Sequence, residues 1–110
     1  MRVSVLQDNL LRAIGTVIKA VDSRPTLPVL ANILLKTEDA RLMLVASNLE
    51  MSIVTYVGAR VDQRGAITLP AKLLQELVAN LSRDRVDLTL DAAIHTVNVR
   101  CGTTSTNMKG

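Results

Sequence analysis

The chain is almost without aromatic side chains: among its 110 residues there is no Phe and no Trp, and Tyr56 is the single aromatic residue. A surface that stacks single-stranded bases needs several aromatic rings. The sequence therefore argues against such a surface. It also predicts a core built almost wholly from aliphatic side chains.

Cysteine and histidine are equally scarce, since Cys101 and His95 are the only residues of each type. A single cysteine excludes a disulfide framework and a Cys-based metal cluster, and we expect Cys101 to be a small core residue. His95 is expected in the middle of a strand, partly buried with Val97 and Val99. The chain shows no glycine-rich phosphate loop, no nucleophile elbow and no His/Glu metal pair. We therefore predict no catalytic residue, metal or cofactor, although a small hydrolase using His95 remains an alternative.

Long apolar runs and a strong excess of charge are also missing. No apolar run approaches the roughly 18 residues of a membrane span, and no basic-then-apolar leader follows Met1, so we expect a cytoplasmic protein. Thirteen Lys and Arg against ten Asp and Glu give a net charge of +3, which permits contact with a polyanion without requiring it. The length and the 48% of hydrophobic residues indicate one folded domain, residues 1–110.

Two apolar stripes with helical spacing predict two helices. Asp8 is the expected N-cap of the first helix, and Pro70 is expected at the start of the second, where a missing N–H costs nothing. The stripes consist of Leu10, Leu11, Ile14, Val17, Ile18 and Val21, and of Leu73, Leu74, Leu77, Val78 and Leu81.

The rest of the chain is predicted to be strands joined by short turns, which imply antiparallel pairing. The element order is β-α-β-β-β, twice. This order favours an α+β fold, a duplicated unit with both helices on one face of antiparallel sheet and an open edge strand at each end. The predicted strands are 1–6, 29–36, 41–46, 50–57, 66–69, 86–90, 94–101 and 103–108, with a further alternating piece at 59–62. Asp87 and Asp91 are expected on the solvated face of the sheet.

The outward faces of the two predicted helices carry Arg12, Lys19 and Lys72, and Glu76 is the only acid well inside either helix. Such faces are either ordinary solvated surfaces or a surface for nucleic acid. A helix of about 14 residues is roughly 21 Å long, and duplex DNA of that length carries on the order of a dozen phosphates. Three or four cations neutralise only part of this charge. Binding by one domain should therefore be weak, salt-sensitive and independent of sequence.

The segment Ser23–Leu35 joins the first helix to a long strand. Pro25 and Pro28 each fix their own φ and move the preceding residue out of the α region, so the helix must end before them. Arg24 is thereby held on a stiff corner just beyond the helix end. It is either a solvated arginine in a turn or a phosphate contact.

Several short motifs occur in the order found in one family: Arg24-Pro25-Thr26-Leu27-Pro28, Asn48-Leu49-Glu50-Met51, Leu69-Pro70-Ala71-Lys72, and Val99-Arg100 with Gly102. With them, the sequence resembles the first domain of the bacterial DNA polymerase III beta subunit, the sliding clamp. The resemblance covers nearly the whole chain. It implies a non-catalytic protein in which two identical chains, each of three similar domains, form a ring around duplex DNA and tether the replicative polymerase. It also implies that polymerase and clamp loader bind through domains absent from this chain.

The resemblance also assigns roles to individual residues. Arg24 falls on the DNA-contacting arginine of the family, which favours the phosphate contact, and Lys72 and Arg12 fall on basic positions of the two pore-lining helices. The predicted DNA contact of Lys19 rests on helix-face geometry alone. The last strand, with Thr104, Thr106 and Met108, matches the edge that pairs with the third domain of the other chain. The alternative is a stand-alone interaction module that pairs through this C-terminal edge strand.

Overall fold

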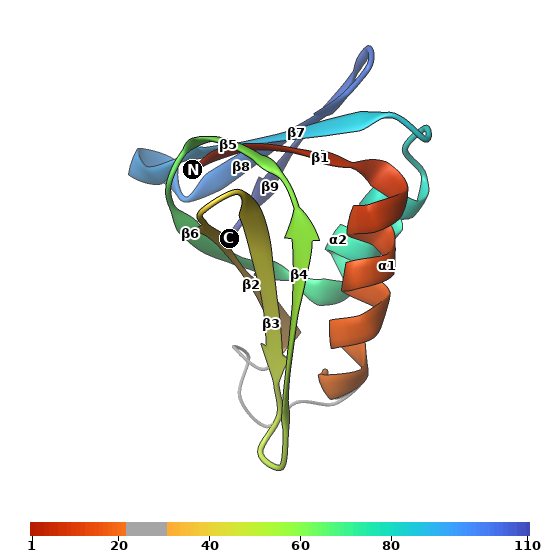
Figure 1. Ribbon diagram of the computed structural model, residues 1–110, viewed down its shortest axis with the longest axis vertical. Helices are drawn as coiled ribbons and strands as arrows, with labels where there is room; N and C mark the ends of the chain where they lie inside the picture. Colours follow the sequence, from red (N-terminus) through yellow and green to blue (C-terminus); the bar gives the residue numbers. More distant parts are fainter. Residues whose placement is uncertain (22–30) are drawn as a thin grey trace.

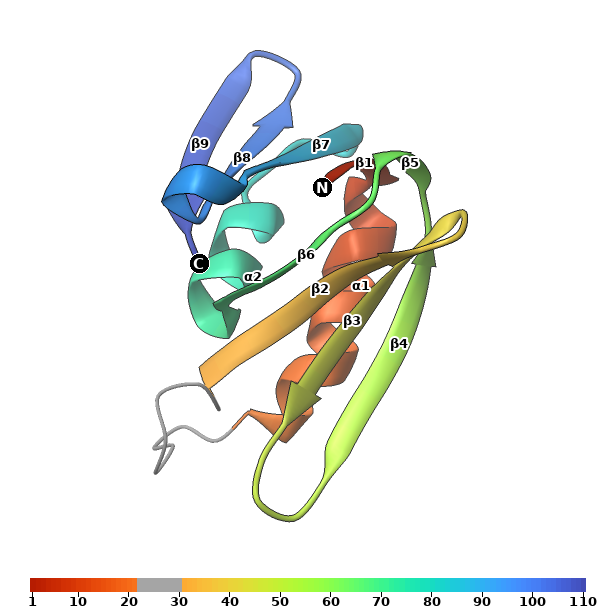
Figure 2. The same cartoon turned by 90° about the vertical axis from the view of Figure 1, so that its left-hand side faces the viewer.

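The computed structural model describes residues 1–21 and 31–110, which form two antiparallel sheets with two helices packed on one side (Figures 1 and 2). The α+β prediction is therefore confirmed. No helix in these residues is long and apolar enough to cross a membrane. The helical elements are α1 (Gln7–Val17), η1 (Ile18–Ala20), α2 (Ala71–Ala79) and η3 (Ala92–Ile94). The strands are β1 (Arg2–Leu6), β2 (Asn32–Glu38), β3 (Arg41–Ser47), β4 (Ser52–Gly58), β5 (Arg60–Gln63), β6 (Ala66–Pro70), β7 (Arg85–Asp91), β8 (Thr96–Cys101) and β9 (Thr104–Lys109).

The two halves of the chain exchange their first strands. One sheet, called sheet A, has the order β5-β1-β7-β8-β9, and the other, sheet B, has the order β4-β3-β2-β6. Strand β1 of the first half thus pairs with β7 of the second half, and β6 of the second half pairs with β2 of the first. Neither sheet is complete without a strand from the other half, so the halves are expected to fold as one unit.

Alternation along the strands builds the core. In sheet B, Leu35 lies opposite Leu44, and both side chains are fully buried. In sheet A, Leu88 lies opposite Val99, and these two are also fully buried. Successive side chains of a strand point to opposite faces of the sheet, so the residues that alternate with these buried ones point away from the core. The core is aliphatic, as predicted, and it includes Cys101.

The predicted N-cap of the first helix is wrong. Helix α1 begins at Gln7, its N-cap is Leu6, and no side chain caps it. Strand β1 runs directly into the helix, and the backbone N–H of Gln7 donates instead to the carbonyl oxygen of Asp84 at 3.0 Å. Among residues 1–21 and 31–110, the carboxylate of Asp8 accepts only from the N–H of Asn9. A hydrogen bond from a distant loop therefore replaces the local cap that the sequence suggested.

His95 does not lie in a strand, which corrects a second prediction. The carboxylate of Asp91 accepts a hydrogen bond from the N–H of Ala93, and this turn leads into the short helix η3. His95 follows with a positive φ of 46° and is exposed, and β8 begins only at Thr96. The chain thus turns where the apolar Ile94 had suggested a continuous strand.

Two glycines offer a matched pair of stability predictions. A Cβ at Gly65 would lie 2.7 Å from the Met1 backbone nitrogen, whereas a Cβ at Gly15 on α1 meets nothing within 4 Å. We expect Gly65→Ala to lower the free energy of unfolding by about 1–3 kcal/mol, because backbone must move. Gly15→Ala should raise it by about 0.5–1 kcal/mol, because alanine favours the helix. Urea unfolding of both variants checks this, and a loss at Gly15 that equals the loss at Gly65 contradicts it.

Candidate nucleic-acid interface

Helix α1 and its continuation η1 place two cations on the outside of the molecule. Leu10, Ile14 and Val17 are fully buried, so this stripe fixes how the helix is rotated about its axis. Arg12 and Lys19 lie on the opposite, exposed side, as predicted. They are seven residues apart, or about two helical turns, and therefore share one face.

Helix α2 places Lys72 in its first turn. The helix starts at Ala71, directly after Pro70, which is its N-cap. Ala71, Leu74 and Val78 are fully buried, and Lys72 is exposed on the other side. The predicted start of this helix at Pro70 is thus confirmed to within one residue.

The two helices run antiparallel. The side-chain amide of Gln7, at the start of α1, donates to the carbonyl oxygen of Val78 near the end of α2 at 2.8 Å. Ile14 comes seven residues after Gln7, and Ala71, at the start of α2, comes seven residues before Val78. In antiparallel helices these two residues lie at about the same level along the axes. Lys72 therefore lies roughly level with Ala13, next to the turn that carries Arg12. Both views place the helices on the same side of the sheets, so their outward faces form one surface (Figures 1 and 2).

This outward surface carries cations that have no ion-pair partner among the described residues. Among residues 1–21 and 31–110, the ion pairs are Arg41–Glu38, Arg60–Asp62 and Arg85–Asp87, and all of them lie on strands or their ends. Arg12, Lys19 and Lys72 have no acidic partner within the described chain. Their charge is available to an anion, although Asp8 and Glu76 on the same helices reduce the total. Arg24 lies outside the described residues.

The single aromatic residue of the sequence, Tyr56, contacts an arginine side chain. The guanidinium of Arg41 lies 4.0 Å from the centroid of the Tyr56 ring, on the outside of strands β3 and β4. Such a contact is a cation–π interaction, which covers one face of the ring.

The candidate catalytic residues are dispersed. His95 is exposed just before β8, and Cys101 is buried, with its Sγ 3.6 Å from the carbonyl oxygen of Ser82. Asp87 faces outward, as predicted, and accepts a hydrogen bond from Ser4. Within the part of the chain that is described, no three His, Cys, Asp or Glu side chains are grouped to hold a metal ion. These positions give no support to a hydrolase that uses His95.

Strand β9 is the edge of sheet A and pairs only with β8 in the described structure. Thr104 is exposed and Thr106 is half-buried, but Met108 is buried against the core, at 4% exposure. Between β9 and α2 lies a groove of about 380 Å³. Its lining residues are Leu73, Glu76, Leu77, Asn80, Thr106, Asn107 and Met108. The sequence analysis placed Leu73 in the apolar stripe of the second helix, and this prediction is wrong, because its side chain is 54% exposed at this groove.

Comparison with known proteins identifies the family. A family model described as the N-terminal domain of the DNA polymerase III beta subunit matches residues 1–110. The chain belongs to this family. The beta sliding clamp of Synechococcus elongatus is 39% identical over 112 residues, which cover 100% of this chain and 30% of that protein. The beta sliding clamp of Caulobacter vibrioides is 40% identical over 90 residues, or 82% of this chain and 24% of that protein.

Solved structures of the DNA polymerase III beta subunit family share the fold. The sliding clamp from Caulobacter crescentus matches with a TM-score of 0.93 and 34% identity, over 99% of this chain and 30% of that chain. The clamp from Bacillus subtilis matches with a TM-score of 0.95 and 25% identity, over 100% of this chain and 31% of that chain. The chain thus spans about 30% of the length of these relatives.

Proposed function

We propose that this chain is a DNA sliding-clamp domain whose helices α1 and α2 face duplex DNA inside a ring. The family match over residues 1–110 carries the proposal. The cations on the outward helix surface support it, because Arg12, Lys19 and Lys72 can contact phosphates without reading bases. Arg24, a further DNA contact in this proposal, rests on sequence resemblance alone.

The proposed ring consists of two identical chains of three similar domains each, with residues 1–110 as the first domain. The length of the relatives supports this arrangement, since the chain spans about 30% of them. We place one ring contact at the β9 edge, through Thr104 and Thr106 and the adjacent groove, with Met108 at its floor. An edge strand offers backbone hydrogen bonds to a partner strand, and the exposed Leu73 adds apolar area.

The domain has no catalytic role in this proposal. Its ring tethers the replicative polymerase to DNA, and polymerase and clamp loader bind through other domains, in the cytoplasm. Weak contacts suit such a task, because tight or sequence-specific contacts would stop the ring from sliding. Retention on DNA comes from closure of the ring, and the helices supply only a favourable electrostatic lining.

The salt dependence of duplex binding tests the role of the helix surface. We expect the 110-residue chain to bind a 20-base-pair duplex only in the millimolar to high micromolar range, and less with added salt. The variant Arg12→Gln/Lys19→Gln/Lys72→Gln should weaken binding and reduce the slope of log K against log [salt] by up to about 3, or roughly 0.9 for each phosphate that is no longer neutralised. Titration of the duplex, followed by NMR at several salt concentrations, measures both quantities.

The matched control is Lys36→Gln/Arg64→Gln/Lys109→Gln, which removes the same charge from exposed positions outside the helices. If both triple variants lower the slope equally, the helix surface has no special role. Nanomolar binding that depends on sequence would contradict the clamp proposal itself. A stable dimer of this chain alone in sedimentation would favour the stand-alone interaction module, which the family match does not favour.

A further inference from the structure

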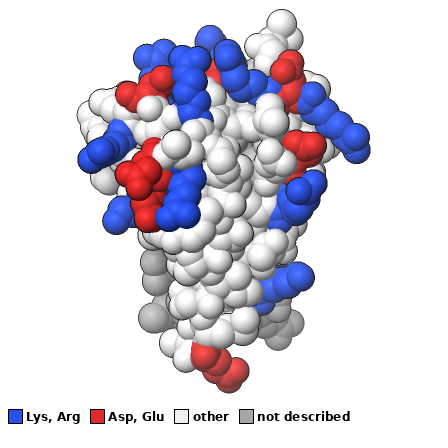
Figure 3. Space-filling view, in the orientation of Figure 1, with Lys and Arg blue, Asp and Glu red and all other residues white. Residues whose placement is uncertain are grey.

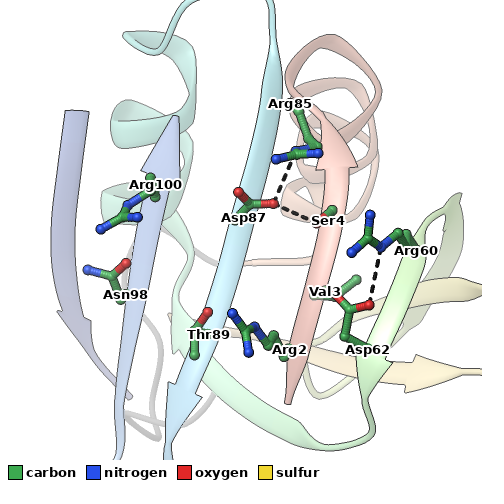
Figure 4. A pocket seen from close by; sticks show the side chains of 10 residues that line it. All are labelled: Arg2, Val3, Ser4, Arg60, Asp62, Arg85, Asp87, Thr89, Asn98 and Arg100. Atoms are coloured by element: carbon green, nitrogen blue, oxygen red, sulfur yellow. Dashed lines mark hydrogen bonds and ion pairs between the residues drawn. The ribbon is translucent and has the colours of Figure 1, made fainter. Parts of the chain in front are cut away.

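The outer face of sheet A carries a row of polar side chains that crosses four strands. Arg60 on β5 lies opposite Ser4 on β1, Ser4 lies opposite Asp87 on β7, and Asp87 lies opposite Arg100 on β8. Arg2 stands in the next row on β1, opposite Thr89. These side chains point to the same side of the sheet (Figure 4). This face is remote from the helix surface, because the helices cover the other side of the sheets.

The row lines a hollow of about 330 Å³. Its lining residues are Arg2, Val3, Ser4, Arg60, Asp62, Arg85, Asp87, Thr89, Asn98 and Arg100. We call this hollow the arginine cup. It holds four of the nine arginines of the chain and none of the four lysines. Four arginines against two aspartates give it a net charge of +2. Sheet A forms the upper part of the molecule in Figure 1, and charged side chains gather over this part in the same view (Figure 3).

The guanidinium groups of the arginine cup retain free donors. Arg60 contacts Asp62 through Nε at 3.1 Å, and Arg85 contacts Asp87 through Nε at 3.4 Å. Neither contact uses the terminal nitrogens. Arg2 and Arg100 form no ion pair within residues 1–21 and 31–110. Each of the four guanidiniums can therefore still offer its terminal N–H groups to a carboxylate or a phosphate.

We propose that the arginine cup binds an extended acidic peptide segment of a protein partner. Neighbouring strands are about 4.8 Å apart, so the backbones at Arg60 and Arg100 are separated by about 14 Å. Side chains four residues apart in an extended peptide are separated by about 13 Å, which matches this spacing. Two acidic residues at that interval fit the two arginines. The residue midway between them lies between Ser4 and Asp87, beside the Asp87 carboxylate that accepts from the Ser4 hydroxyl, and must be neutral or basic.

Charge pattern favours a peptide over a nucleic acid. Asp62 and Asp87 stand among the arginines, and they would repel the evenly spaced phosphates of a nucleic-acid backbone. A peptide avoids this repulsion, because it can place a cation over the acid and carboxylates over the guanidiniums. The cup also lacks, among its described lining residues, an exposed aromatic or aliphatic side chain on which a base could stack. Arginine rather than lysine is the usual cation of protein interfaces, because its planar fork matches a carboxylate.

Two synthetic peptides of equal composition test the proposal on the 110-residue chain. The matched peptide is Thr-Glu-Thr-Lys-Thr-Glu-Thr, and the permuted peptide is Thr-Glu-Thr-Glu-Thr-Lys-Thr, both with blocked ends. We expect the matched peptide to bind about tenfold more tightly, since it forms one more charge-assisted hydrogen bond and avoids one repulsion. Chemical-shift changes in NMR titrations give the affinities and the residues affected.

The variant Arg60→Gln/Arg100→Gln should weaken binding of the matched peptide about tenfold. The control variant Lys36→Gln/Arg64→Gln, with the same loss of charge, should leave it within about twofold. Equal binding of both peptides, or equal effects of the two variants, overturns the proposal. Arginine substitutions that instead weaken binding of a 20-base-pair duplex more than the control does would assign the cup to nucleic acid and also overturn it.

Discussion

Leu74→Ala is expected to lower the free energy of unfolding by about 3–4 kcal/mol, because it empties a fully buried site on α2. Removal of the methyl groups leaves a cavity in a core that is close-packed and can relax only in part. A domain of this size has a total stability of roughly 5–15 kcal/mol, so the variant loses a large share of it. Urea unfolding followed by circular dichroism measures the change.

Leu73→Ala provides the matched control, since it makes the same substitution at the neighbouring position of the same helix. Leu73 is 54% exposed, so its truncation should cost less than about 1 kcal/mol. Both variants have equal helix propensity, and the difference between them isolates burial. Equal losses would show that the stripe through Leu74 does not form the core and would contradict the orientation of α2. Leu73 also lines the β9 groove, so Leu73→Ala is the variant in which to look for a weaker contact at this groove.

Local patterns were enough to predict most elements of the fold. Strand alternation around Leu88 and the helical stripe through Leu10 and Ile14 encode burial directly, because each period fits one geometry. The short strand at 59–62 is confirmed as β5, and the α+β class is confirmed as well. Two of the errors lie where a single contact overrides the local signal. The bond from Gln7 N–H to Asp84 displaces the expected cap at Asp8, and the turn capped by Asp91 removes His95 from its strand.

Long-range pairing could not be predicted from the sequence. Nothing local to β1 or β6 indicates that each joins the sheet of the other half, since many registers satisfy the same alternation. The arginine cup depends on that exchange, because Ser4 of β1 stands between Arg60 and Asp87 only after β1 has joined sheet A. The cations of the helix surface were predictable for the opposite reason. Arg12, Lys19 and Lys72 follow from the helix period alone, and Arg24 lies outside the described residues.

Gln7→Glu is expected to lower the free energy of unfolding by about 3 kcal/mol at pH 7. Gln7 is 4% exposed, and its amide links the start of α1 to the last turn of α2 by donating to the Val78 carbonyl oxygen. A carboxylate at this position cannot donate, and it would face the negative end of the α2 dipole in a buried site. This hydrogen bond joins the two helices, so the variant should also loosen the outward surface that carries Lys72.

The loss should depend on pH in a defined direction. Burial and the helix dipole raise the pKa of the introduced carboxyl in the folded state above its unfolded value of about 4.3. The folded variant therefore holds its proton more tightly than the unfolded chain. Its deficit in free energy of unfolding relative to the parent is small below about pH 4 and grows as the pH rises through the folded pKa. Gln7→Leu removes the same hydrogen bond without adding charge. Its deficit should stay near about 1 kcal/mol at every pH, since the Val78 carbonyl oxygen keeps the bond from Leu81 N–H. Urea unfolding of both variants and the parent between pH 4 and pH 8 separates the two cases, and a deficit of Gln7→Glu that does not change with pH contradicts the buried contact.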